Sequence, residues 1–200
     1  MKDTLANLLS LQQELREINK LNELAFFIAH QSKVVIDYQR AIVWSSWQNK
    51  HIQIKSISGI TRLNKTSPYQ LSATEFIDKL ITYYAQNKEV QTIDSETAVE
   101  AVNKIWLEPL SKYVTFYFFR NNHKEVIGGI LLLNNELPEE NEFKQFDWIA
   151  HSYKQAWLHL SKPRNIFGQF TYYFKSRKRR IIWLIIVVLH TLNKQRQNVV

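Results

Sequence analysis

The residue types that most often carry acid–base or metal chemistry are dispersed along this chain. Its six histidines include no pair at a metal-binding spacing with a carboxylate beside it, so we predict no metal site. The acidic run at 139–142 lacks the alternate spacing of a calcium-binding loop and suits the positive end of a helix. The chain has no cysteine, which excludes thiol catalysis and a disulfide scaffold. We therefore predict a protein that is not an enzyme and carries no cofactor.

The adjacent glycines Gly128 and Gly129 do not form a phosphate-binding loop. They lie inside an apolar run with strand character, whereas a phosphate-binding loop stands between a strand and a helix. Glycine within a strand marks either a bulge or the close approach of another part of the molecule. We expect one of these two structural roles here.

Aromatic side chains offer the remaining chemistry, which is the binding of a small ligand. The candidate pocket residues are Trp44, Trp106, Phe116 and Phe118. Aromatic residues in strands pack in a core more often than they contact a ligand, and a pocket also needs convergent polar groups. Both interpretations, core and pocket, therefore stay open at this stage.

The basic character of the protein is confined to its C-terminal region. Residues 161–200 contain nine Lys or Arg and no acidic residue, whereas residues 1–160 contain 17 basic and 18 acidic residues. The formal charge of +8 is therefore not a property of the body, which lacks the spread of basic groups that phosphate contacts require. We predict no nucleic-acid partner. The basic cluster comprises Lys175, Arg177, Lys178, Arg179 and Arg180.

An apolar run follows the basic cluster directly, which is typical of a segment at a membrane surface. The run from Ile181 to Leu192 has twelve residues, about 18 Å as a helix, against about 30 Å of hydrocarbon in a bilayer. Whether it spans the membrane, lies flat in the interface or packs on another chain stays open. The apolar residues expected in the membrane include Ile181, Trp183, Leu184, Ile185 and Val188.

The charge pattern also predicts where the body lies. The first twenty residues alternate charged residues with leucine and contain no continuous apolar stretch, so they are not a secretory signal. Basic residues beside a membrane segment favour the cytoplasmic side. We expect an inner-membrane protein whose body faces the cytoplasm and whose basic cluster contacts the anionic inner leaflet.

Residues 4–36 are predicted to form one long helix. Apolar residues recur at steps of three and four from Leu8 through Leu11 and Leu15 to Ile18, and the pattern continues through Asn22. Two interpretations of this seam stay open. The helix packs on its own domain, or it pairs with a second copy of the chain.

The remaining pattern predicts short strands and helices in alternation. A hairpin is expected over 40–47 and 51–58, and another, rich in aromatic and branched residues, over 113–120 and 125–133. A single strand is expected at 90–93. Helices are expected at 72–86, at 96–107, and from Pro138 to 160.

This order of elements predicts an α+β fold with a central, mostly antiparallel sheet. The first and last helices are expected to pack together on one face of it. The body occupies 1–162, a basic juxtamembrane segment 163–180, a short apolar membrane segment 181–192, and a polar tail 193–200. We expect the segment that carries the basic and apolar runs to form a membrane-proximal helix.

The end of the predicted body carries a family resemblance. A strand at 126–134 (Val-Ile-Gly-Gly-Ile-Leu-Leu-Leu-Asn) precedes a short acidic loop and a helix with an apolar stripe. With the order of elements, this ending resembles a GAF domain over residues 10–160. The resemblance implies a small-ligand pocket on the sheet face opposite the first and last helices. The stripe comprises Phe143, Phe146, Ile149, Ala150 and Ala156.

A narrower resemblance includes the C-terminal region. A long N-terminal helix, a GAF-like body, a basic cluster and an apolar segment together resemble the N-terminal part of HlyD-type secretion adaptors, which are membrane-fusion proteins of Gram-negative bacteria. In that family the membrane helix leads into a large periplasmic region, whereas this sequence ends at Val200. The resemblance implies a secretion-system protein as a candidate partner.

These observations favour a non-enzymatic sensory or protein-interaction module tethered to the inner membrane. We expect it to be a homodimer through its N-terminal and C-terminal helices. The first alternative is a shortened component of a secretion or efflux adaptor, and the second is a regulatory domain that binds an unknown small molecule. The sequence does not identify that ligand.

Overall fold

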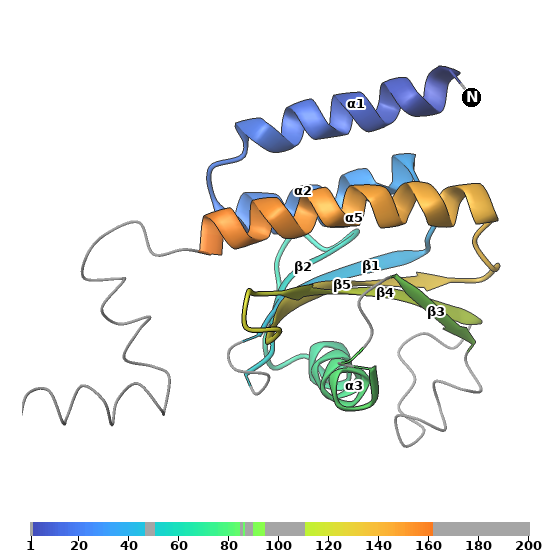
Figure 1. Ribbon diagram of the computed structural model, residues 1–200. Helices are drawn as coiled ribbons and strands as arrows, with labels where there is room; N and C mark the ends of the chain where they lie inside the picture. Colours follow the sequence, from blue (N-terminus) through green and yellow to red (C-terminus); the bar gives the residue numbers. More distant parts are fainter. Residues whose placement is uncertain (1, 47–50, 85, 87–89, 95–110, 162–200) are drawn as a thin grey trace, which may run out of the picture. The chain divides into compact units, whose positions relative to one another are not determined.

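A five-stranded antiparallel sheet separates the helices of this protein into two groups (Figure 1). The computed structural model describes residues 2–46, 51–84, 86, 90–94 and 111–161. The strands are β1 (Arg40–Ser45), β2 (Gln53–Ile57), β3 (Gln91–Asp94), β4 (Tyr113–Arg120) and β5 (Val126–Asn134). Their spatial order is β2-β1-β5-β4-β3, and every neighbouring pair is antiparallel. The predicted antiparallel sheet is confirmed, and β5 is its central strand.

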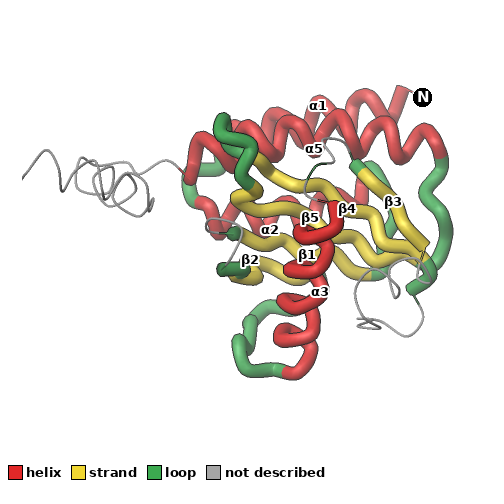
Figure 2. Tube along the Cα trace, turned by 60° about the horizontal axis from the view of Figure 1, so that its bottom comes forward, coloured by secondary structure: helices red, strands yellow, loops and turns green. Residues whose placement is uncertain are grey.

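The helices lie on opposite faces of this sheet. Helices α1 (Lys2–Glu17), α2 (Leu21–Gln31) and α5 (Glu140–Ser161) are on one side, and α3 (Pro68–Tyr84) is on the other (Figures 1 and 2). A short 3₁₀ helix, η1 (Ser32–Val34), leads from α2 toward β1. The expected arrangement, with the first and last helices on the same face, is confirmed.

The prediction of one continuous helix over 4–36 is wrong, because the chain turns back after α1. Helices α1 and α2 run in opposite directions (Figure 1), and Lys20 between them has an extended backbone. The Asn19 side chain donates a hydrogen bond of 2.9 Å to the Glu17 carbonyl, which competes with continuation of the helix. The apolar face of α1 packs into the core of its own domain through Leu8, Leu11 and Leu15. The seam ends at the turn, and Asn22 beyond it is exposed.

Other boundaries differ from the expected ones for local reasons. Helix α3 begins at Pro68 instead of Ser72, because the Ser67 hydroxyl accepts a hydrogen bond from the Gln70 amide and proline is favoured at the first helical position. The predicted 113–120 strand has the bounds of β4. The predicted helix at 96–107 and the segments at 163–180, 181–192 and 193–200 lie outside the described residues. Among the helices that the structure does describe, none combines the length and apolarity needed to cross a bilayer.

The strands divide the core into two layers because successive side chains point to opposite faces. On β1, Ala41 and Val43 pack toward α1, α2 and α5, whereas Ile42 and Trp44 pack toward α3. The same alternation continues on the neighbouring strands. Tyr117, Phe119, Ile130 and Leu132 belong to the first layer, and Phe116, Phe118, Leu131 and Leu133 belong to the second.

The two glycines of β5 lie beneath a tryptophan on each face of the sheet. A Cβ atom at Gly129 would lie 2.7 Å from Cζ2 of Trp44, and one at Gly128 would lie 3.1 Å from the indole of Trp157. Each position would also bring a Cβ within 2.6 Å of a backbone oxygen. The register with β4 shifts beside this pair, since Phe119 is opposite Gly128 while Arg120 is opposite Val126. The expected close approach is confirmed at both glycines, whereas the irregularity in register lies beside them.

This close approach predicts that Gly129→Ala destabilises the protein. The added methyl group would meet both the Trp44 ring and the Tyr117 carbonyl oxygen, so the strand or the ring must move. We expect a loss of about 1–3 kcal/mol in the free energy of unfolding, the usual range for overpacking. Urea unfolding followed by circular dichroism measures it. The control is Asn135→Ala at the exposed position directly after the same strand, and an equal loss in both variants would refute the explanation.

Candidate ligand-binding site

An aromatic cluster covers the face of the sheet that carries α3. The sheet brings together three of the predicted pocket residues, Trp44, Phe116 and Phe118. The ring centroids are 6.0 Å apart for Trp44 and Phe118 and 5.2 Å apart for Phe116 and Phe118. Tyr84, at the end of α3, adds a fourth ring 5.4 Å from Phe116. The remaining predicted residue, Trp106, lies outside the described residues.

The cluster is closed by its own side chains in the described part of the chain. Trp44 and Phe116 are each 1% exposed and Phe118 is 3% exposed. Phe76 and Leu80 of α3 belong to the same buried layer. These rings therefore form the core between the sheet and α3, and their contact with a ligand stays a prediction.

Polar groups occur at the margins of this cluster, where the sequence alone did not place them. The guanidinium of Arg120 lies over the Phe118 ring at 5.5 Å, and burial lowers its pKa. At the opposite end of the sheet, Arg40 lies 5.7 Å from the Tyr69 ring and donates to the Ser58 carbonyl at 3.2 Å. Each pairs a cation with an aromatic face. The sequence signal for each of these contacts is an arginine at one end of a strand that contains aromatic residues.

Ser46 is a buried polar group next to the cluster. It directly follows β1, two residues beyond Trp44, and its side chain is 8% exposed. Its hydroxyl oxygen has no hydrogen-bond partner among the described residues. A buried hydroxyl without a partner is unfavourable, so it is a group that a bound ligand would satisfy.

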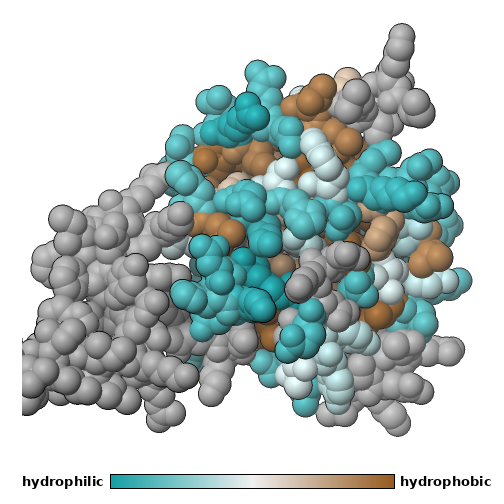
Figure 3. All heavy atoms as spheres, viewed as in Figure 1, coloured by the Kyte–Doolittle hydropathy of each residue, from teal (hydrophilic) through white to brown (hydrophobic). Residues whose placement is uncertain are grey.

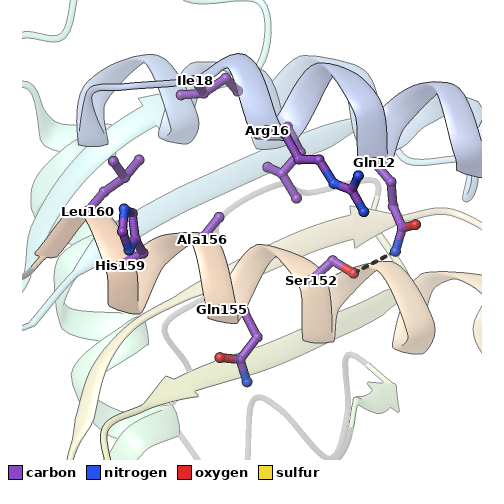
Figure 4. A pocket seen from close by; sticks show the side chains of 9 residues that line it. Gln12, Arg16, Ile18, Ser152, Gln155, Ala156, His159 and Leu160 are labelled. Carbon is purple, nitrogen blue, oxygen red and sulfur yellow. Dashed lines mark hydrogen bonds between the residues drawn. The ribbon is translucent and has the colours of Figure 1, made fainter.

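A pocket with a volume of about 380 Å³ lies between α1 and α5 (Figure 4). Gln12 and Ser152 point toward each other across it and form a hydrogen bond of 3.1 Å. Arg16 and His159 stand in the last turns of their helices, where cations stabilise the negative helix end. That role accounts for both basic residues, so we do not assign them to a ligand.

The helical face also carries exposed apolar residues. Hydrophobic side chains are visible along α1 in the view of Figure 3. Leu9 of α1 is 55% exposed and Trp148 of α5 is 45% exposed. These residues belong to the first and last helices, which the sequence analysis assigned to a dimer contact.

A polar chain connects β4, α5 and the start of β3 on the same face. The Tyr117 hydroxyl lies 3.2 Å from Nδ1 of His151, whose Nε2 lies 3.9 Å from the Asp147 carboxylate. Asp147 accepts a hydrogen bond of 3.3 Å from the Val90 amide. No group of three or more potential metal ligands (His, Cys, Asp or Glu) is found in the described part of the chain.

Burial raises the pKa of three tyrosines of the helical layer, Tyr38, Tyr117 and Tyr153. It raises the pKa of Tyr117 to about 12, an effect that the Asp147 carboxylate increases and the Arg120 guanidinium opposes. Burial also raises the pKa of Tyr38 to about 12, and its hydroxyl donates a hydrogen bond of 2.9 Å to the Ala29 carbonyl. The Tyr117 and Tyr38 hydroxyl groups therefore stay protonated at neutral pH.

Solved structures share this architecture. The chain is similar to the GAF domain of an Acinetobacter phosphoenolpyruvate-protein phosphotransferase, with a TM-score of 0.61 and 12% identity over 83% of this chain and 99% of that domain. It is also similar to a bacteriophytochrome of R. palustris, with a TM-score of 0.58 and 12% identity over 80% of this chain. A phytochrome photosensory core module of Stigmatella aurantiaca gives a TM-score of 0.54 at 9% identity over 78% of this chain.

These similarities establish a GAF-like α+β fold. This chain spans 38% of the bacteriophytochrome and 36% of the photosensory module. No known protein-family profile matches the sequence, and no curated protein matches it either. At identities of 9–12%, the similarity concerns the fold alone.

The raised tyrosine pKa values predict a loss of stability in alkali. An ordinary tyrosine ionises near pH 10, so between about pH 10 and 12 the unfolded chain releases protons that folded Tyr117 and Tyr38 retain. The free energy of unfolding should therefore fall as pH rises through this window. Tyr117→Phe should reduce that slope, and adding Tyr38→Phe should reduce it further.

Urea unfolding at a series of pH values provides the measurement. Between pH 7 and 9 both states are protonated at these tyrosines, so the variant and wild-type profiles should run parallel there. Profiles that also run parallel from pH 10 to 12 would contradict the assignment.

Proposed function

We propose that this protein is a non-enzymatic sensory or protein-interaction module whose GAF-like body responds to a small molecule. The observation that carries the proposal is the buried aromatic cluster on the α3 face, beside which the Ser46 hydroxyl has no hydrogen-bond partner among the described residues. The GAF-like fold supports it, because the resemblance implied a ligand pocket on this same face. The described residues supply no acid–base or nucleophile cluster that would favour an enzyme.

The chemistry of the site favours a planar, largely apolar ligand. The aromatic rings would stack on such a molecule, Ser46 would hydrogen-bond to it, and Arg120 at the margin would favour a partial or full negative charge. An aromatic carboxylate is the simplest compound with these properties. A structurally similar bacteriophytochrome domain binds a chromophore, but this chain has no cysteine to which one could be attached through a thiol.

A thermal-shift screen of metabolites against the full chain tests the ligand proposal. A compound at a hundredfold its dissociation constant stabilises the folded state by about 2.7 kcal/mol, which raises the melting temperature by roughly 5–10 °C. We expect an aromatic acid to produce such a shift. If no compound in a broad panel shifts the melting temperature, a purely protein-binding role replaces the ligand proposal.

The variant Ser46→Ala sharpens this test because its two effects have opposite signs. Without ligand, removing a buried unpartnered hydroxyl should leave the melting temperature unchanged or raise it. With ligand, the shift should shrink because a hydrogen bond is lost. The matched control is Trp148→Ala, which changes an exposed residue of α5 and should retain the full ligand shift.

The tether is the second part of the proposal. We propose that residues 175–180 bind the anionic inner leaflet and that the apolar run 181–192 holds the chain at the inner membrane, with the body in the cytoplasm. The sequence pattern supports this, since a basic cluster adjoins the most apolar run of the chain. A homodimer through α1 and α5 is compatible with exposed Leu9 and Trp148. The adaptor alternative, with a secretion-system partner, stays a prediction.

Co-sedimentation of the full chain with lipid vesicles tests the tether. We expect binding to vesicles with anionic lipid and a loss on the order of a thousandfold when Arg177, Lys178, Arg179 and Arg180 are all changed to Gln, since each basic residue near such a surface contributes about 1 kcal/mol and each 1.4 kcal/mol is tenfold. The control changes exposed Lys20, Lys33, Lys124 and Lys144 of the body to Gln, which removes the same charge. Equal losses in both variants would refute a specific tether.

A further inference from the structure

Two tryptophans contact adjacent glycines of one strand from opposite faces of the sheet. Trp44 of β1 lies against Gly129, and Trp157 of α5 lies against Gly128. Both indoles are 1% exposed, and each belongs to a different core layer. The central strand β5 is therefore all that separates the aromatic cluster on the α3 face from helix α5 at this point.

The neighbouring residues of β4 complete the contact on each face. Phe118 is opposite Gly129 and packs with Trp44 at 6.0 Å, whereas Phe119 is opposite Gly128 and packs with Trp157 at 5.1 Å between ring centroids. Each glycine thus lies beneath a pair of rings. From Ile130 to Leu133, in contrast, each residue of β5 has a side chain that packs into one of the two layers.

We propose that the Gly128–Gly129 pair couples the α3 face of the sheet to helix α5. A close-packed interior has no free volume to absorb the movement of a ring. If Trp44 moves, Gly129 has no side chain that could rearrange, so the displacement passes to the backbone of β5. The adjacent residue Gly128 contacts Trp157 directly, and α5 receives the change near its C-terminal end.

Through this coupling, a ligand bound at the proposed site would affect α5, and in that respect the coupling rests on the proposed function. A ligand that stacks in the aromatic cluster must contact or displace Trp44, which is a central ring of that cluster. The response would reach α5 without any movement of α3. The physical coupling itself can be measured without knowledge of the ligand.

The test uses the full chain labelled with ¹⁵N at tryptophan and follows the indole Nε1–H resonance of Trp157, assigned with Trp157→Phe. Nε1 of Trp157 is one of the atoms closest to Gly128, so it reports on this contact. Trp44→Phe shortens the ring over Gly129, and we expect it to shift the Trp157 resonance by more than its linewidth. The resonance of exposed Trp148, also on α5, should stay in place.

Phe116→Leu is the matched control. It removes a ring from the same buried layer, but Phe116 is opposite Leu131 and not a glycine. We expect this variant to leave the Trp157 resonance unchanged. A folded Trp44→Phe variant with an unshifted Trp157 resonance would overturn the proposal. An equal shift in Phe116→Leu would also overturn it, because general loosening of the layer would then be the cause.

Chemical rescue provides a second measurement. Trp44→Ala opens an apolar cavity, and free indole is the probe that fills it. Indole should return the Trp157 resonance toward its wild-type position, and a stabilised variant with an unrestored resonance would count against the coupling. If Trp44→Ala does not fold, Trp44→Phe decides the matter. A failed metabolite screen with a shifted Trp157 would remove the ligand proposal and retain the coupling.

Discussion

The contact between two indole rings and the glycine pair of β5 is the constraint on which the rest of the structure depends. A Cβ atom at either position would clash with a backbone oxygen. The two residues of β5 between Trp44 and Trp157 must therefore be glycine. The strand in question is the centre of the sheet, paired with β1 on one side and β4 on the other. Both core layers are therefore anchored at this point.

The two layers differ in how their polar groups are arranged. On one face, α1, α2 and α5 pack together, and their buried polar groups are bonded internally, as in the contacts of Tyr38 with Ala29 and Ser32 with Tyr153. On the other face, α3 covers an aromatic cluster with cationic groups at its margins, and the Ser46 hydroxyl beside it has no partner within the described part of the chain. The first layer is a structural core in which the Tyr38 and Ser32 hydroxyl groups are hydrogen-bonded. The second resembles a binding surface closed by its own side chains.

The GAF-like fold unites these features without assigning a function. Solved structures with the same architecture are 9–12% identical to this chain, so their similarity reflects a shared arrangement of sheet and helices. A fold of this kind hosts many functions. The proposed function rests on the residues of the site itself, whose types favour stacking and hydrogen bonding over covalent chemistry.

Local sequence patterns determined several helices and strands of this protein. Alternation of apolar residues predicted the β4–β5 hairpin, and Pro138 with the acidic residues after it predicted the start of α5, because these signals act within a few residues. The sequence did not predict the turn between α1 and α2, because the apolar spacing continues across it from Leu15 to Leu21. The hydrogen bond that ends α1 comes from the Asn19 side chain. Only the tertiary structure brought Trp44 against Gly129 and Trp157 against Gly128. It also placed Arg120 over the Phe118 ring. Strand register and helix docking set those contacts, and both are decided by packing between residues far apart in the chain.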